Sequence, residues 1–360
     1  MKKTFLATTS VSNHFGDKYR ARLAFKIIGI TLAVLIGILF ILICPAFSGK
    51  LPRVDAVTSY SGDNPYITFD KKCLVSAHRA GGALAPENTL KAFENCLTAT
   101  EYNVDILEFD LHLTKDDQLI LLHDDTLNRT SNATEVFGSK KVYAKDKTLA
   151  EIKTLNMGEN FVDENGKMPY KGLRGKDIPS DCKIVTLNEV LDYTESMRSD
   201  LNYIIEIKDG DNVGRKATDK LYQTIKERNL LNRVIIGTFQ GEITKYMDEK
   251  YPDIIRSASI AEVLLTYYRF LFNVNLDKCN VGFEVLQVPH IPLFDMGQKS
   301  FIDYCHHYGI AVQFWTINDY DEIKELVDSG ADAIITDNPK TANKVIKCFY
   351  GKRFRKLIFA

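Results

Sequence analysis

The sequence predicts an α/β protein whose eight strands form a TIM (β/α)8 barrel. From about residue 71 onward, short apolar runs alternate with stretches of helical periodicity, a pattern typical of a parallel sheet covered by helices. The predicted strands are Leu74–His78, Ile106–Asp110, Tyr203–Lys208, Val234–Phe239, Ile254–Ala258, Val285–Val288, Ala311–Thr316 and Ala333–Thr336. Their number favours the barrel, because barrels of this class have eight parallel strands.

Helical stretches occupy most of the gaps between these strands. The predicted helices are Asn88–Ala99, Leu187–Met197, Gly214–Arg228, Ser300–His307 and Tyr320–Ser329. Pro86 precedes the first of them, and Gly330 follows the last, where a glycine commonly ends a helix. Residues 124–186 contain few apolar runs and several glycines, so they are interpreted as a small insertion over one end of the barrel.

A ninth apolar run, Leu119–His123, follows the second predicted strand after only a few polar residues. A parallel crossover needs about a dozen residues or more, so this run is expected to return antiparallel, as the second arm of a hairpin. A turn centred between residues 116 and 117 would place His123 opposite Asp110. The turn contains no glycine, and a shift of one residue would change every pairing.

The N-terminal segment differs in composition from the rest of the chain. Ile27–Phe47 comprises 21 consecutive residues without a charge, enough to cross a hydrocarbon core of roughly 30 Å as a transmembrane helix. Six basic residues and one acidic residue precede it, so the positive-inside rule keeps the N-terminus in the cytoplasm and places the following residues outside. A cleaved signal peptide is the competing interpretation, although its apolar region is typically only about 7–15 residues long.

The chain thus divides into five predicted segments. They are a basic cytoplasmic segment (1–26), a transmembrane helix (27–47), a polar linker (48–70), the barrel with its insertion (71–347) and a basic tail (348–360). A formal net charge of −1 and the lack of a long basic block argue against a nucleic-acid partner. The seven cysteines lack zinc-type spacing and leave disulfide pairing open, and the sequence defines no oligomeric state.

Three carboxylates are expected to meet at the mouth of the barrel. Glu108 and Asp110 lie two residues apart on one strand, so their side chains share a face, and Glu206 lies near the end of another strand. In such barrels the working groups project from the carboxyl ends of the strands. Oxygen ligands suit a hard divalent cation, Mg²⁺ or Ca²⁺. The alternative is that Glu108 and Asp110 are ordinary interior charges of the barrel, paired with Lys208 or Arg79.

Two histidines are expected beside these carboxylates. His78 ends the first predicted strand, and His123 ends the hairpin arm. Imidazoles titrate near neutral pH, which suits general acid and base catalysis, whereas a single histidine at a strand end is more often a structural hydrogen-bonding group. Arg79 offers a forked donor for phosphate oxygens and Lys208 a point charge, so these residues indicate an anionic substrate.

Six motifs, in order, resemble those of the glycerophosphodiester phosphodiesterase family. They are His78-Arg79-Ala80-Gly81-Gly82 with Pro86-Glu87-Asn88-Thr89, Glu108-Phe109-Asp110 with Thr114-Lys115-Asp116, His123-Asp124 with Leu127-Asn128-Arg129-Thr130, Glu206-Ile207-Lys208, Phe314-Trp315-Thr316-Ile317-Asn318, and Gly330–Asp337. The resemblance spans about residues 73–345. One departure is Ala80, which stands where family members often have glycine.

The resemblance implies a TIM barrel of the phospholipase C-like phosphodiesterase type and a set of roles for its residues. Glu108, Asp110 and Glu206 would be the ligands of a divalent cation, Mg²⁺ or Ca²⁺. His78 and His123 would act as acid and base, and Arg79 and Lys208 would contact phosphate. Trp315 would stand at the mouth, either as a substrate wall or as a packed aromatic of the barrel.

The resemblance also implies a reaction. A glycerol hydroxyl of the substrate attacks phosphorus, an alcohol departs, and water opens the resulting cyclic phosphate to glycerol phosphate. Three alternatives stay open: a barrel phosphodiesterase that acts on intact lipid, lysophospholipid or an anionic cell-surface polymer, a non-catalytic barrel that binds glycerophosphate groups, and a membrane-tethered scaffold. The concentration of carboxylates and histidines at strand ends disfavours the last two.

Overall fold

The structure is a computed structural model that describes residues 26–27, 29–38, 60, 62–68, 72–291 and 293–358. The chain forms two compact units, residues 1–52 and 53–360. In the first unit, residues 26–27 and 29–38 are helical. Among the described residues, no helix is both long enough and apolar enough to span a membrane. Residues 28 and 39–47 of the predicted transmembrane segment, and 1–25 of the predicted cytoplasmic segment, lie outside the described residues.

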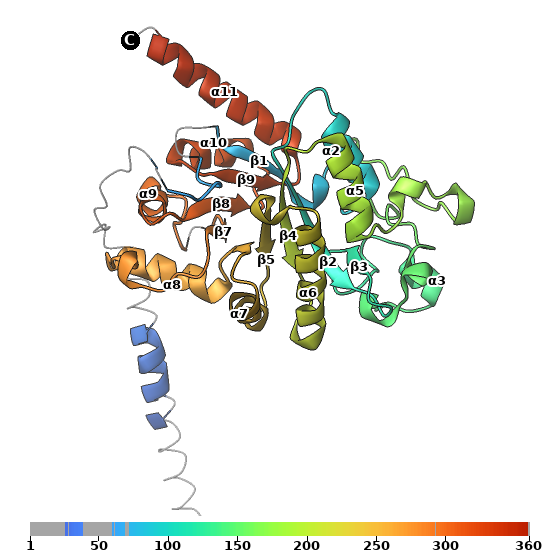
Figure 1. The fold of residues 1–360 in the computed structure, drawn as a ribbon, viewed down its shortest axis with the longest axis horizontal. Helices are drawn as coiled ribbons and strands as arrows, with labels where there is room; N and C mark the ends of the chain where they lie inside the picture. The colour runs from blue at the N-terminus through green and yellow to red at the C-terminus, as the bar shows by residue number, and fades with distance from the viewer. Residues whose placement is uncertain are drawn as a thin grey trace, which may run out of the picture. The chain divides into compact units, whose positions relative to one another are not determined.

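The second unit is built on a parallel barrel surrounded by helices (Figure 1). Its strands follow the order β6-β5-β4-β2-β1-β9-β8-β7, with parallel neighbours throughout. A parallel bridge between Ser257 and Val285 joins the two ends of this path. The strands are β1 Leu74–Ala77, β2 Ile106–Leu113, β3 Leu119–Leu121, β4 Asn202–Ile207, β5 Val234–Gly237, β6 Ile255–Arg256, β7 Val285–Pro289, β8 Ala311–Trp315 and β9 Ala333–Thr336. The predicted eight-stranded barrel is confirmed, and each predicted strand overlaps an observed one.

The helices are α2 Leu90–Thr98, α3 Ala133–Phe137, α4 Leu149–Ile152, α5 Leu187–Met197, α6 Asp211–Glu227, α7 Gly241–Lys250, α8 Ile260–Leu271, α9 Lys299–His307, α10 Tyr320–Ser329 and α11 Pro339–Ile358. The sequence predicts five of them, and Gly330 ends α10 in the left-handed conformation, as expected. It misses α8, an apolar helix whose charged residues are Glu262 and Arg269. It also misses α11, which extends through most of the segment predicted as a basic tail.

Aromatic side chains fill the space between the barrel and its outer helices. Phe109 of β2 makes edge-to-face contacts with Phe93 of α2 and Tyr203 of β4, with ring centroids 5.6 and 6.3 Å apart. The strands are therefore covered on both faces, which explains why they read as nearly continuous apolar runs. The six cysteines of the described residues are free thiols.

β3 returns antiparallel beside β2, as the sequence predicts, but in a different register. Leu111 lies opposite Leu121, and the Leu122 amide donates to the Asp110 carbonyl at 3.1 Å. The predicted pairing of His123 with Asp110 is therefore wrong by one residue. The reason is a three-residue loop whose last residue, Asp117, has a φ of 61°, since a left-handed residue in that place is typical of such hairpins.

The insertion has a small core of its own that is continuous with the hairpin. Its buried residues are Ile120, Leu122, Leu127, Ala133, Val142, Ala144, Ile152, Leu155, Met157 and Ile184. Ile120 belongs to β3 and also forms an antiparallel bridge with Thr186, at the start of α5. The insertion is thus fastened to the barrel beside the end of β3, where it can contribute side chains to the mouth.

Part of the segment predicted as a linker packs against the barrel. The Asn64 side-chain amide donates to the carbonyls of Glu284 and Gly309 at 2.7 and 2.8 Å, just before β7 and β8 begin. Tyr66 is only 1% exposed, and it packs among apolar residues of six barrel strands. Residues 62–68 therefore cover the end of the barrel at which the parallel strands start.

Tyr66→Ala is expected to lower the free energy of unfolding by about 3–5 kcal/mol, because truncating a large buried aromatic leaves a cavity. Urea denaturation followed by circular dichroism measures the change. Asp63→Ala is the control, since Asp63 is exposed in the same segment and its replacement should change stability by no more than about 0.5 kcal/mol. If Tyr66→Ala were as stable as the wild type, the segment would not belong to the folded barrel.

Candidate active site

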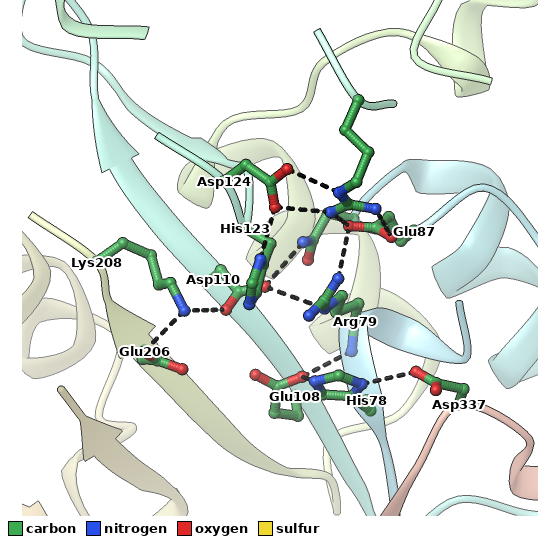
Figure 2. Close-up of polar contacts among 12 residues, drawn as sticks. His78, Arg79, Glu87, Glu108, Asp110, His123, Asp124, Glu206, Lys208 and Asp337 are labelled. Carbon is green, nitrogen blue, oxygen red and sulfur yellow. Dashed lines mark hydrogen bonds and ion pairs between the residues drawn. The ribbon is translucent and has the colours of Figure 1, made fainter. Parts of the chain in front are cut away.

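The charged side chains predicted for the site gather around one pocket, from β2, from the ends of β1 and β4, and from the residue His123 after β3 (Figure 2). The residues that line this pocket include His78, Arg79, Glu108, His123, Glu206 and Trp315. Lys208 and Asp110 join the same cluster, because Lys208 Nζ lies 2.9 Å from Glu206 Oε1 and 3.5 Å from Asp110 Oδ1. The structure thus brings together all eight residues that the sequence predicts for the site.

The three carboxylates form the floor of the cluster. Glu108, Asp110 and Glu206 each offer an oxygen, and these oxygens lie within 4.8 Å of one another. The strand register explains this, since Asp110 pairs with Glu206 across β2 and β4 and Glu108 shares the face of Asp110. Burial, with the charge of Asp110, raises the pKa of Glu108 to about 8, and burial also raises the pKa of Glu206. Without a cation, the cluster is therefore electrostatically unfavourable.

Asp110 differs from the other two carboxyl groups because its pKa is lowered. Burial opposes this shift, but the positive charges of Lys208, His123 and Arg79 outweigh burial. The Asn88 side-chain amide also donates to Asp110 Oδ2 at 3.0 Å. Asp110 Oδ1 is buried and accepts no hydrogen bond from any residue that the structure describes. A charged, buried oxygen with unused acceptor capacity is well suited to bind a cation.

His78 is held by a carboxylate on the adjacent strand end. Its Nδ1 lies 2.7 Å from Asp337 Oδ1, and the Asn318 side-chain amide donates to Asp337 Oδ2 at 2.8 Å. This contact turns Nε2 toward the carboxylates, 4.0 Å from Glu108 Oε2. Burial lowers the pKa of His78, but Glu108 and Asp337 outweigh burial, so the pKa of the imidazole is raised overall.

His123 has a corresponding carboxylate partner but the opposite pKa shift. Its Nδ1 lies 2.8 Å from Asp124 Oδ1. Burial lowers the pKa of His123, and the charge of Asp110 and the contact with Asp124 offset this only in part. In both imidazoles, Nδ1 contacts a carboxylate and Nε2 is available to the pocket. Their pKa values, however, are shifted in opposite directions.

An arginine of the insertion connects the two sides of the site. Arg129 donates to Glu87 at 2.7 and 2.8 Å and to Asp124 at 2.7 and 2.9 Å. Arg79 Nη1 donates to the same Glu87 carboxylate at 3.1 Å. Arg129 and His123 outweigh burial and lower the pKa of Asp124 to about 2. The network runs without a break from Arg79 to His123, as the dashed lines in Figure 2 show.

The backbone after β1 directs Arg79 into the site. Arg79, Ala80 and Gly81 have φ values of 51°, 60° and 80°, so three successive residues are left-handed. This turn lets the Arg79 amide donate to Glu108 Oε2 at 2.6 Å. Ala80, where the sequence departs from the family pattern, adopts a conformation that glycine adopts more readily.

Two large aromatic rings line the opposite side of the pocket, beside the polar residues Thr238, Ser257, Gln287 and Thr316. Trp315 packs edge-to-face against Phe239, with ring centroids 5.8 Å apart, and Lys208 Nζ lies 5.6 Å from the centroid of the Phe239 ring. Ala258 lines the same side. The charged groups thus come from β1 to β4 and the residues just after these strands, whereas the aromatic rings come from the last residue of β8 and the segment after β5.

Four residues of the network carry functional contacts that the sequence reasoning does not assign: Glu87, Asp124, Arg129 and Asp337. Asp124 directly follows His123, and Asp337 directly follows β9. Their positions just after strands could have indicated that they lie near the site. Glu87 and Arg129 lie in loops that are 42 residues apart, and nothing in their spacing indicates that they meet.

The sequence from residue 78 to 341 matches the family model described as the glycerophosphoryl diester phosphodiesterase family. The chain belongs to this family. A glycerophosphodiester phosphodiesterase of Caldanaerobacter subterraneus is 29% identical over 276 residues, which are 77% of this chain and 98% of the relative. A human lysophospholipase D is 27% identical over 285 residues, covering 73% of this chain and 82% of the relative.

Solved structures of family members have the same barrel fold. A putative glycerophosphoryl diester phosphodiesterase of Silicibacter pomeroyi has a TM-score of 0.60 at 19% identity, over 78% of this chain and 94% of its own. A phosphodiesterase of Oleispira antarctica, in complex with the product sn-glycerol-3-phosphate, has a TM-score of 0.56 at 20% identity, over 77% and 97%. Together with family membership, the curated relatives identify this glycerophosphoryl diester phosphodiesterase family member as a phosphoric diester hydrolase.

Glu108→Gln is expected to stabilise the metal-free protein near pH 8 and to have little effect near pH 5. The pKa of Glu108 is about 8 in the folded chain and about 4.3 when unfolded. At pH values between these two pKa values, the folded state binds more protons than the unfolded state, so the free energy of unfolding falls as pH rises. Glutamine does not titrate, so the variant lacks this loss of stability. Thermal unfolding in chelator across this pH range measures it. Glu325→Gln, at an exposed position, is the control, and an unchanged slope in Glu108→Gln would contradict the raised pKa.

Proposed function

We propose that this protein hydrolyses glycerophosphodiesters to glycerol phosphate and an alcohol, by acid and base catalysis between two histidines beside a divalent cation. The observation that carries the proposal is the pocket itself. Three carboxylate oxygens within 4.8 Å of one another lie beside two imidazoles, each held through Nδ1 by a carboxylate at 2.7 or 2.8 Å. Family membership provides the reaction class, and this geometry provides groups suited to that reaction.

Glu108, Asp110 and Glu206 would hold the cation, either Mg²⁺ or Ca²⁺. Two observations support this fit: the unused acceptor of Asp110 Oδ1 and the raised pKa of Glu108. A hard cation would satisfy that acceptor and offset the repulsion between the carboxylates. When bound, it would supply Lewis-acid polarisation of the phosphate oxygens and a template for the diester.

Arg79 and Lys208 would bind the phosphate group. Arg79 Nε is buried and has no hydrogen-bond acceptor among the residues that the structure describes, so it has a donor to offer a phosphate oxygen. Lys208 carries its charge between Asp110 and Glu206 and its pKa is raised, since these two carboxylates outweigh burial. Both side chains therefore offer donors suited to the oxygens of an anionic substrate.

The pKa shifts suggest which histidine accepts a proton first. His123, whose pKa is lowered, would accept through Nε2 the proton of the glycerol hydroxyl as its oxygen bonds to phosphorus. His78, whose pKa is raised, would donate from Nε2 to the departing alcohol oxygen as its bond to phosphorus breaks. A water molecule would then open the cyclic phosphate with the two roles reversed.

His78→Ala and His123→Ala are each expected to lower kcat by about 10²–10⁴-fold while leaving the circular dichroism spectrum unchanged.

Two further variants show which histidine is the acid and which is the base. Asp337→Asn removes a carboxylate that raises the pKa of His78, so the alkaline limb of kcat/KM should move to lower pH. Asp124→Asn should likewise lower the pKa of His123 and move the acidic limb to lower pH. If Asp337→Asn moved the acidic limb and Asp124→Asn the alkaline limb, His78 would be the base and His123 the acid. Wild-type turnover in both alanine variants would exclude both histidines from catalysis.

A second candidate substrate is a lysophospholipid. The apolar wall of Trp315 and Phe239 beside the phosphate groups is suited to a glycerol that bears an acyl chain, and one relative is a lysophospholipase D. The same proton transfers would then release the headgroup alcohol and leave an acyl-glycerol phosphate. Intact lipid and an anionic cell-surface polymer belong to the same alternative.

The proposal includes a location at a membrane. Ile27–Phe47 would act as a single uncleaved anchor, and the basic residues before it would keep the N-terminus in the cytoplasm. The barrel would then work on the extracytoplasmic side, beside the lipid surface from which lysophospholipids and glycerophosphodiesters derive.

The substrate and the metal are tested together with a panel of glycerophosphodiesters and lysophospholipids, after chelation and after addition of Mg²⁺ or Ca²⁺. Soluble glycerophosphodiesters should be cleaved, and chelation should lower turnover by about 100-fold or more, because Lewis-acid stabilisation contributes several kcal/mol. Glu206→Gln should weaken the recovery on adding the cation. Full activity after complete chelation would exclude the carboxylate site, and turnover of lysophospholipids alone would favour the second substrate class.

A further inference from the structure

Large apolar side chains are exposed on the outer surface of α8, where the long surface helices α6 and α10 expose mainly charged residues. Its inward face consists of buried residues, which are Val263, Thr266, Tyr267, Phe270 and Leu271. On the opposite face, Ile260, Leu265 and Phe272, the residue just after the helix, are 54%, 48% and 61% exposed. A surface helix normally places polar side chains on the face that points away from the core.

Together with two half-buried residues, Leu264 and Tyr268, these exposed residues form a stripe along the helix. The α8 stripe is defined here as Ile260, Leu264, Leu265, Tyr268 and Phe272, of which four are spaced by four residues and so lie one above the other. Glu262 and Arg269 are the charged residues of α8. Glu262 is not available to make the face polar, because it forms an ion pair with Arg256 at 2.9 Å.

Two other outer helices, α6 and α10, carry charged and polar residues on their exposed faces. The exposed residues of α6 include Arg215, Lys216, Gln223, Lys226 and Glu227. Those of α10 include Asp321, Lys324, Glu325 and Asp328. A contiguous apolar surface on a soluble domain commonly marks a site of contact with a partner or a membrane.

The stripe reaches from the mouth of the barrel toward its opposite end. Ser257 and Ala258 line the pocket, so Ile260, two residues later, lies at the mouth. At the other end, the Tyr304 hydroxyl of α9 donates to the Val274 carbonyl at 2.7 Å. The segment 62–68, which precedes the barrel, is also attached at this end, because the Asn64 side-chain amide donates to the Gly309 carbonyl just after α9.

We propose that the α8 stripe rests on the surface of a lipid bilayer, an inference that rests on the proposed membrane anchor. Residues 48–59 separate the uncharged segment Ile27–Phe47 from Tyr60, and a link of this length spans at most roughly 45 Å. The anchor would therefore keep the barrel beside the bilayer. Leucine and phenylalanine are among the side chains with which amphipathic helices enter the interfacial region, and tyrosine is enriched at membrane interfaces.

Docking through the stripe would bring the pocket to the lipid surface. Three further apolar residues are exposed in segments that follow the two strands flanking β6: Phe239 after β5, and Ile291 and Leu293 after β7, at 47%, 38% and 53% exposure. Phe239 is also a wall of the pocket. A single-chain phospholipid could pass along this apolar rim from the bilayer to the phosphate-binding groups without its acyl chain crossing water.

Sedimentation with vesicles of phosphatidylcholine and phosphatidylglycerol tests this contact on residues 53–360, which form a compact unit. The double variant Leu265→Glu/Phe272→Glu should weaken vesicle binding by about tenfold or more, because charged groups would have to enter the interface. The matched control is Val136→Glu/Met197→Glu, at positions that are 44% and 47% exposed on other elements, and it should bind as the wild type does. Both variants should hydrolyse a soluble glycerophosphodiester at the wild-type rate.

Three results would overturn the proposal: a wild-type barrel that does not sediment with vesicles, a double variant that sediments equally well, or a wild-type dimer by light scattering that the double variant converts to a monomer. The last would show that a second copy of the chain covers the stripe. Sedimentation requires no turnover, so it stays interpretable if the proposed hydrolysis fails. Conversely, loss of binding with normal soluble hydrolysis separates docking from catalysis.

Discussion

The structure of the site depends on one electrostatic constraint, the convergence of three carboxylates at the floor of the mouth. Glu108, Asp110 and Glu206 repel one another in a buried setting, and burial raises the pKa of two of them. Positive charge and donors surround the cluster, with Lys208 between two of the carboxylates and the Arg79 amide on the third. A divalent cation bound by the three carboxylates would offset the repulsion that these positive groups and donors offset only in part.

The mouth of the barrel has a charged side and an aromatic side. The ends of β1 to β4 carry the charged groups, and the insertion stabilises them through Arg129, which binds both Glu87 and Asp124. The end of β8 and the segment after β5 carry the aromatic side of the pocket, with Trp315 and Phe239 in contact. Such a division suits a substrate that is anionic at one end and apolar at the other, and it places the apolar half beside α8.

Much of the fold could be predicted because each strand is a separate apolar run that is buried on both faces. The site could be predicted in part for a related reason, since residues at strand ends in a barrel must meet at one mouth. The hairpin shows the limit of this reasoning. His123 reaches the mouth although its predicted pairing with Asp110 is wrong, because β3 ends at Leu121 and the chain beyond it no longer follows the strand register.

The sequence by itself determined the class of fold, the eight strands and the identity of the groups at their ends, because apolar periodicity and strand position are local properties of the chain. The tertiary structure decided which groups touch. The pairing of His78 with Asp337, the bridge from Arg129 to Glu87 and the exposed stripe of α8 all depend on segments brought together by barrel closure. Contacts between distant residues follow from packing and register, and spacing along the chain does not encode them.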